Sequence, residues 1–439
     1  MKRFNQILLV ASAATLSTGL IVAAQPTTGR ILIPNAIQLP PDFKVAQLPP
    51  ALSAAKIRTH VIKPLNVQNV KSFEFSGPRQ AVLRSPKIFK VKPTLDVGAF
   101  GTAVHSILKD QVNGYVFQVR KGDNIVYTLK WNWAKTPTDG GTGWNENTRM
   151  HIASVSKLLT AMGMVKALEM KGVSEDAKII DYLPDYWSKG QNINKITFRN
   201  LMQQTSGFAT NTSSSDYGFM KGMVASGVNG VGSYDYENMN FGICRILIPI
   251  LMGDINKNVK FTDNSAINDS TWDAVTLYHY KNFMQSRVFS PSGVQNADFD
   301  HIPGEQKALA YKYPAGNSDG WDSGDLQSVA GGAGWRLSTK ELLAVMATFR
   351  TKGTIVSPTK AQYCLDNYFG LDQILDSPAG KLYNKNGGWG DGIGRTEQCV
   401  SYFMPNNTEV AIFVNSPVSA QNTFLRTLIN NAFLASIKE

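Results

Sequence analysis

The hydrophobic pattern divides the chain into a regular body and an irregular segment before it. Apolar residues recur at helical spacing over residues 95–111, which predicts an amphipathic helix. Residues 114–134 alternate between apolar and polar around a Lys-Gly-Asp turn at 121–123, which predicts a β-hairpin. A longer apolar helix is predicted over residues 154–172, ending at Gly172.

The later part of the body predicts helices first and strands again near the end. Residues 173–330 are rich in Asn, Ser and Gly, and we expect mostly helices and loops there. Two strands are predicted within residues 397–417, and a helix over residues 420–437. Strands at both ends and helices between them predict an α/β (α+β) fold. Its antiparallel sheet is built from both chain ends, is flanked by helices and has an inserted all-helical subdomain at about 173–330.

The first residues have the pattern of an export signal. Lys2 and Arg3 precede an apolar run that ends in small residues at Ala24, so we expect a signal peptide over 1–24. An uncleaved membrane anchor is the alternative. No later run of about 18 apolar residues occurs, and we therefore expect an exported protein, periplasmic or secreted, with no transmembrane segment after cleavage.

The net charge of +11 is concentrated in one segment. Residues 25–93, here called the N-terminal arm, hold eleven Lys and Arg, two acidic residues and ten of the 20 prolines. Such a composition predicts an extended arm or linker before a domain at 94–439. The arm would contact an anionic envelope surface or simply remain solvated. It lacks the interleaved aromatic residues of nucleic-acid readers, so no nucleic acid is expected as a partner.

Cysteine and histidine give little chemistry. Three cysteines are too few for a disulfide scaffold, although export would permit one bridge. Cys364 and Cys399 are the better pair because Cys244 lies in an apolar stretch, and three unpaired thiols remain the alternative. No Cys/His cluster has the spacing of a metal site, so neither a metal nor a cofactor is expected.

The pattern Ser-x-x-Lys occurs at Ser53, Ser106, Ser154 and Ser357. Only Ser154 begins a long apolar helix directly after a strand-like segment. Unpaired N–H groups at a helix start stabilise negative charge on a serine oxygen, and Lys157 lies one turn along on the same face. Its amine could accept the hydroxyl proton. The alternative is that Ser154 only caps the helix.

Two later segments favour the nucleophile. Tyr236-Glu237-Asn238 precedes an apolar helix, and Lys385-Asn386-Gly387-Gly388 leads into the predicted strand pair. Together with Ser154-x-x-Lys157, these motifs resemble the signatures of penicillin-recognising serine enzymes. The Tyr-x-Asn form resembles the branch of class C β-lactamases, D-Ala-D-Ala carboxypeptidases and family VIII esterases. The stretch "ITFRNLMQQTSGF" is also similar to that branch, and the resemblance covers roughly residues 97–436, with a β-lactamase/DD-peptidase-like fold implied.

The resemblance implies a role for each motif residue. Ser154 would form an acyl-enzyme, and Lys157 and Tyr236 would share the proton transfers. The backbone N–H groups of Ser154 and Gly388 would form the oxyanion hole. Substrate would be bound by Asn238, Lys385 and Asn386, with Asn238 hydrogen-bonding either the substrate amide or Lys157. Of these, Lys385 would bind a substrate carboxylate. Asn386 stands where the family has threonine, which leaves carboxylate recognition open.

The function implied is a secreted serine hydrolase that acts on an ester or amide through an acyl-enzyme. Its substrate would be a small molecule or a peptide, as for an esterase or a D-amino-acid peptidase. A true class C-like β-lactamase is one alternative. A non-catalytic cell-wall binding module, with the N-terminal arm on anionic polymers, is another.

Overall fold

The computed structural model describes residues 39–57, 71–72, 78–210, 212, 214–420 and 424–439. Residues Leu39–Glu439 form one compact unit, which is the unit described below. The predicted signal peptide lies outside the described residues, as do parts of the N-terminal arm.

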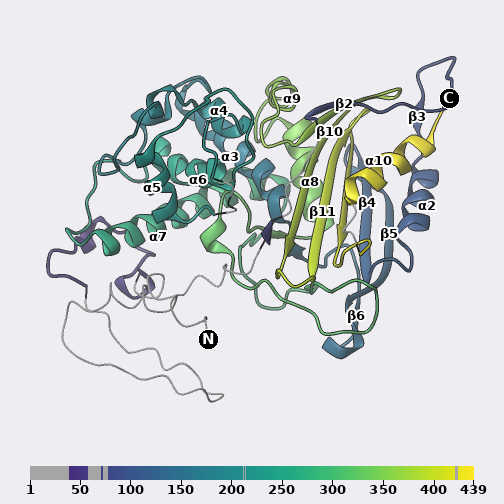
Figure 1. Cartoon of the computed structure of the whole chain (residues 1–439), viewed down its shortest axis with the longest axis horizontal. Coiled ribbons are helices and arrows are strands. Elements are labelled where there is room, and N and C mark those ends of the chain that lie inside the picture. The colour runs from purple at the N-terminus through teal and green to yellow at the C-terminus, as the bar shows by residue number, and fades with distance from the viewer. Residues whose placement is uncertain (1–38, 58–70, 73–77, 211, 213, 421–423) are drawn as a thin grey trace, which may run out of the picture. The chain divides into compact units, whose positions relative to one another are not determined.

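A large, mostly antiparallel sheet forms one side of this unit (Figure 1). Its strands, in spatial order, are β2 (Gln80–Val82), β9 (Gln373–Ser377), β10 (Gly380–Gly390), β11 (Thr396–Met404), β12 (Thr408–Val414), β4 (Gly114–Lys121), β5 (Asn124–Lys135) and β6 (Thr142–Gly143). β1 (Lys71–Ser72) pairs with the end of β10, and only the β2–β9 pair is parallel. Because β4 pairs with β12, the two chain ends meet in one sheet, as the sequence predicts.

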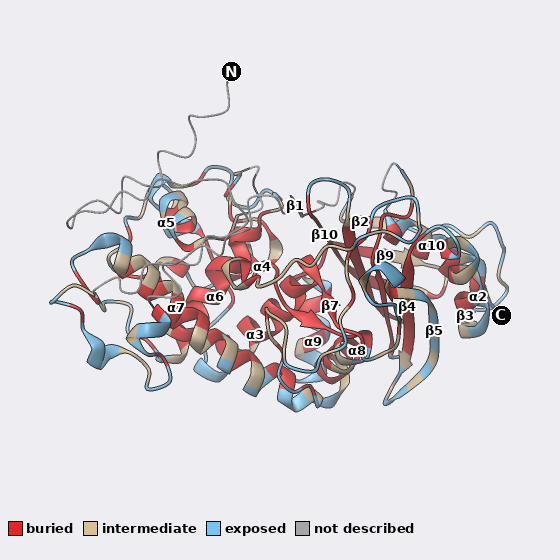
Figure 2. Cartoon of the chain, turned by 90° about the horizontal axis from the view of Figure 1, so that it is seen from below, coloured by how far each residue is buried: buried red, intermediate tan, exposed pale blue. Residues whose placement is uncertain are grey.

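Two helices cover one face of the sheet. α2 (Val97–Leu108) and α10 (Leu425–Ser436) pack against each other, and Phe100 of α2 contacts Phe117 of β4 and Phe433 of α10 edge to face. α2 begins where the Asp96 side chain accepts the Ala99 N–H. β4 is buried along most of its length, whereas exposure alternates along β5, as Figure 2 shows.

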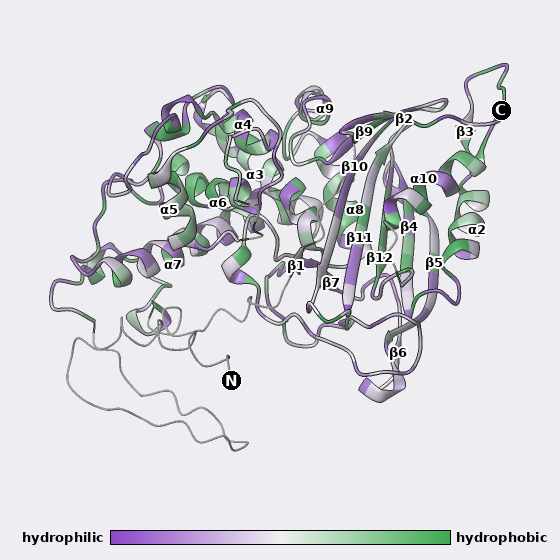
Figure 3. Cartoon of the chain, in the orientation of Figure 1, coloured by the Kyte–Doolittle hydropathy of each residue, from purple (hydrophilic) through white to green (hydrophobic). Residues whose placement is uncertain are grey.

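The other face meets the helical part of the molecule. α8 (Thr339–Ala347) packs on β12 and β4, and α9 (Pro358–Asp366) follows it. This part also contains α3 (Ser156–Lys171), α4 (Phe198–Gln203), α5 (Tyr217–Ser226), α6 (Asn238–Met252) and α7 (Ser265–Met284). α3 packs on α6, which is almost wholly buried and mostly apolar (Figure 3). Two small two-stranded pairs complete the unit, β3 (Thr94–Leu95) with β13 (Ile437–Lys438), and β7 (Met150–His151) with β8 (Arg336–Leu337).

The predicted local features are present. The β4–β5 turn passes through Gly122 in the left-handed region, and α3 ends at Gly172 with φ +62°. Of the two alternatives for the cysteines, the structure has the unpaired one: Cys364 and Cys399 form no disulfide, and all three thiols are free and buried. Cys364 lies in α9 and Cys399 in β11, and each packs within the apolar core.

The described part of the N-terminal arm belongs to the compact unit. Phe43, Leu52 and Ile57 are buried in the core with the helices, and β2 extends the sheet beside β9. Among the described helices, none has the length and apolar character needed to cross a bilayer.

Candidate active site

Ser154 lies in a short 3-10 turn, Ala153–Val155, that leads into α3. Ala153 adopts a left-handed backbone with φ +46°, which is strained for a residue with a side chain. The turn points the Ser154 side chain into the protein, where it is 2% exposed. The strain at Ala153 therefore sits directly before the predicted nucleophile.

The Ser154 hydroxyl contacts the lysine predicted to activate it. Lys157 Nζ donates to Ser154 Oγ at 2.9 Å, and both side chains are buried. Lys157 also donates to the Asn238 side-chain oxygen and, at 2.8 Å, to the carbonyl oxygen of Gly332. Asn238 begins α6, so a loop and two helices converge on one amine.

The other three Ser-x-x-Lys serines serve as local backbone partners. Ser357 Oγ caps α9 by accepting the Lys360 N–H, and Ser106 Oγ donates to the Thr102 carbonyl within α2. Ser53 Oγ accepts the Lys56 N–H at 3.4 Å. The four identical motifs therefore separate by geometry: among the hydrogen bonds of the described residues, only the Ser154 motif joins serine hydroxyl to lysine amine.

Tyr236 lies between two lysines. Lys385 Nζ is 3.3 Å from the Tyr236 hydroxyl, and the Lys157 and Lys385 amines lie 4.8 and 4.9 Å from the centre of its ring. The loop before α6 carries Tyr236, α3 carries Lys157, and β10 carries Lys385. Three segments far apart in sequence thus bring together the hydroxyl, phenol and amines that the motifs predict.

Gly387 allows β10 to approach the Ser154 turn. A side chain at this position would collide with the carbonyl oxygen of Ile152, and its first carbon would lie 3.1 Å from the Ser154 backbone nitrogen. The neighbouring Gly388 is on the same strand, opposite Gln398 of β11. The oxyanion hole formed by the Ser154 and Gly388 amides stays a prediction, and the closeness of the two segments is compatible with it.

Lys385 has a partner that the sequence reasoning missed. It forms an ion pair with Asp372, and the second Asp372 oxygen accepts the Asn386 backbone N–H at 2.9 Å. Burial lowers the pKa of Lys385 below its ordinary value, and Asp372 opposes that shift. The β9–β10 hairpin was the available signal, since its register pairs Gln373 with Asn384 and so brings Asp372 opposite Lys385.

Arg79 of the N-terminal arm reaches the edge of this group. Its guanidinium donates to the carbonyl oxygens of Gln203 (2.9 Å) and Leu371 (3.1 Å). The rings of Tyr234 and Tyr368 lie 4.5 and 4.3 Å from it. Arg79 thus connects the loop that carries Tyr236 to the segment that carries Asp372.

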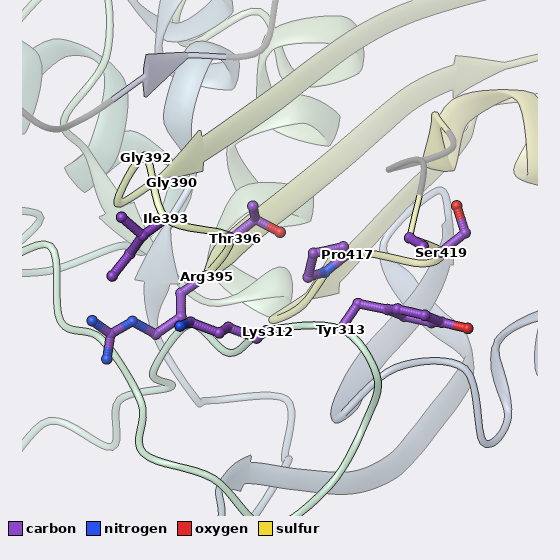
Figure 4. Close-up of a pocket in the computed structure, with 11 residues that line it drawn as sticks. Lys312, Tyr313, Gly390, Gly392, Ile393, Arg395, Thr396, Pro417 and Ser419 are labelled. Atoms are coloured by element: carbon purple, nitrogen blue, oxygen red, sulfur yellow. The ribbon is translucent and has the colours of Figure 1, made fainter.

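A cavity of about 450 Å³ lies beyond the end of β10 (Figure 4). It is lined by residues after β10, including Ile393 and Arg395, and by Lys312, Tyr313 and Pro417 from other loops. Arg395 is paired with Asp391 and Asp319. Within the described chain, the lining contains none of the predicted catalytic or substrate-binding residues.

A known family matches the part of the chain that carries two of the motifs. Residues 97–248, which include the Ser154 and Tyr236 motifs, match the family model for β-lactamase. The chain carries a domain that matches the β-lactamase family. The resemblance seen in the motifs is thereby confirmed. No curated protein matches the sequence.

Solved structures share the fold at low sequence identity. The penicillin-binding protein homologue from Pyrococcus abyssi has a TM-score of 0.58 and 15% identity, covering 74% of this chain and 74% of its own. FmtA from Staphylococcus aureus has a TM-score of 0.58 and 14% identity, covering 80% and 91%. The D-amino acid amidase from Ochrobactrum anthropi has a TM-score of 0.56 and 15% identity, covering 76% and 98%. The chain therefore has a β-lactamase-like fold, a sheet flanked by helices with a helical insertion.

Proposed function

We propose that the protein is a serine hydrolase that acts on an ester or amide through a covalent acyl-enzyme at Ser154. The observation that carries the proposal is the 2.9 Å contact between Ser154 Oγ and Lys157 Nζ, with Tyr236 beside the same amine. A hydroxyl in contact with a buried amine is the arrangement that activates a serine nucleophile.

The proposed reaction has two steps. Ser154 Oγ bonds to the substrate carbonyl carbon, and its proton passes through Lys157 and Tyr236 to the leaving alcohol or amine as the old bond breaks. Water then attacks the acyl-enzyme, releases a carboxylic acid and returns a proton to Ser154. In both steps the backbone N–H groups of Ser154 and Gly388 would stabilise the oxygen that carries the negative charge.

The D-amino acid amidase among the similar structures favours an amide substrate, and an ester stays part of the proposal on the chemistry of the acyl-enzyme. Among the similar structures are a penicillin-binding protein homologue and a D-amino acid amidase. A true β-lactamase stays the alternative substrate class. Hydrolysis of a chromogenic cephalosporin, compared with a p-nitrophenyl ester, separates the two.

A fluorophosphonate probe tests the proposal directly. Ser154 should attack the phosphorus and expel fluoride, which leaves with the serine proton, so the intact protein gains the mass of the probe less HF, and Ser154→Ala should gain none. Ser357→Ala is the matched control, because it removes a serine from the same motif where the hydroxyl only caps a helix. An unlabelled wild-type protein would contradict the proposal and favour the binding module.

We also propose export from the cytoplasm, on the predicted signal peptide over residues 1–24. N-terminal sequencing of the mature protein should begin at Gln25. A mature protein that still begins near Met1 would contradict cleavage.

A further inference from the structure

Lys385, the residue predicted to bind a substrate carboxylate, is already paired with a carboxylate of the protein itself. Asp372 and Lys385 form a buried ion pair, with side chains 3% and 1% exposed. One Asp372 oxygen faces the ammonium, and the other accepts the Asn386 backbone N–H at 2.9 Å. Both oxygens are thus held as a bound ligand carboxylate would be, by one cation and one amide.

We propose that Asp372 occupies the anion position of the site, so that the enzyme selects esters or amides whose leaving group carries no negative charge. This inference rests on the proposed function. A substrate carboxylate would have to displace Asp372 from its two donors or lie beside it as a second buried anion. Both are costly in a site from which water is largely excluded.

The position of Tyr236 identifies the leaving-group side. Lys385 Nζ lies 3.3 Å from the Tyr236 hydroxyl, and in the proposed reaction Tyr236 takes part in protonating the leaving group. The ion pair of Lys385 with Asp372 is therefore next to the leaving alcohol or amine. Its influence should fall on that half of the substrate.

Asp372 is the counter-ion of three cationic side chains, Lys385, Arg79 and Arg426. Burial, and then the charges of Arg79 and Arg426, lower the pKa of Lys385, whereas Asp372 raises it. The same carboxylate also acts on both guanidinium groups. Removing the charge of Asp372 would leave Lys385 and both guanidinium groups without the carboxylate they share, so a substrate carboxylate beside them should be tolerated better.

Two thiolesters that differ only in the charge of the leaving group test the proposal. Both carry the same N-acyl-D-alanyl group. One has mercaptoacetate as its leaving group, and the other has the methyl ester of mercaptoacetate. Thiol release measures kcat/KM for each thiolester. We expect kcat/KM of the wild-type enzyme to be higher for the neutral thiolester by about tenfold or more. Asp372→Asn should shift this preference at least tenfold towards the carboxylate-bearing thiolester.

Asp376→Asn is the matched control. It makes the same substitution further along β9, where the carboxylate accepts a hydrogen bond from Gln80 at the surface, and it should keep the wild-type preference. The wild-type comparison stands even if Asp372→Asn does not fold. Equal turnover of both thiolesters by the wild type, or preference for the carboxylate, overturns this inference alone. Absence of both thiolester turnover and probe labelling at Ser154 overturns the proposed function, and this inference with it.

Discussion

Two buried groups of charged side chains differ in the partners of their cations. In one, Glu305 accepts two hydrogen bonds from Arg336 and one from His301, and Arg149 pairs with Glu341. There each cation meets a carboxylate. In the candidate active site, Lys157 contacts a hydroxyl, an amide oxygen and a carbonyl oxygen.

The contrast shows that burial of charge does not by itself mark a functional site. The group around Glu305 ties β8 to the loop that carries His301 and Glu305, and its side chains hold one another in fixed ion pairs. The group around Ser154 instead places a lysine against an oxygen that can change its bonding. We therefore expect substitutions in the first group to change stability and those in the second to change turnover.

The largest expected effect is on turnover by Ser154→Ala. Loss of the nucleophile should lower kcat by about 10⁴-fold or more, and leave the free energy of unfolding nearly unchanged because only one oxygen atom is removed. Steady-state hydrolysis and urea unfolding measure the two quantities. Ser106→Ala, which removes a serine of the same motif within α2, should retain activity. A stability loss without loss of turnover in Ser154→Ala would place this site in the structural class.

The second largest effect should be a loss of folding stability in Glu305→Gln. Arg336 is 2% exposed, and removing its carboxylate would leave a buried charge without compensation. The free energy of unfolding should fall by about 3 kcal/mol, measured by urea titration. The hydrolysis rate per folded molecule should stay within about twofold, since Glu305 is held by Arg336, His301 and Arg149. A variant as stable as the wild type would show that these ion pairs contribute little.

The smallest effect is the pH dependence of stability set by His301 and Asp322. Hydrogen bonds with Asp322 and Glu305 raise the pKa of His301, so its stabilising charge is present below about pH 6.5 and lost as pH rises through the higher folded value. Burial would raise the pKa of Asp322, but His301 and Lys307 lower it, so its contribution persists until the pH falls below about 4.

His301→Gln should therefore flatten the loss of stability above about pH 6.5, as measured by urea midpoints across pH. His279→Gln is the control of opposite sign, because burial lowers the pKa of His279 and its charging in acid opposes folding. Identical pH profiles for wild type and His301→Gln would show that the ion pairs of His301 do not stabilise the fold.

The fold was predictable because strong local signals agreed with one another. Helical spacing, the Lys-Gly-Asp turn and Gly172 gave α2, the β4–β5 hairpin and the end of α3. The β-lactamase-like fold followed from strands at both ends of the body and from the three motifs. The absent disulfide shows the limit, because a count of cysteines carries no information on the distance between α9 and β11.

The site residues were found by motif, but their partners were not. Asp372 carries no motif, and its role depends on the register of the β9–β10 hairpin. Gly332 acts through its backbone carbonyl oxygen, which every residue has, so its residue type does not predict this role. Arg79 was placed in the N-terminal arm on composition alone, whereas its contacts depend on where the chain returns in space.

The stretch of recognisable similarity and the folded body do not share a boundary. The match begins at residue 97, yet Phe43, Leu52 and Ile57 complete an apolar core and Arg79 joins two segments at the edge of the candidate site. A polypeptide trimmed to begin at residue 97 would expose that core to water and release those segments. Deletion experiments on this protein should therefore retain everything from residue 39 onward.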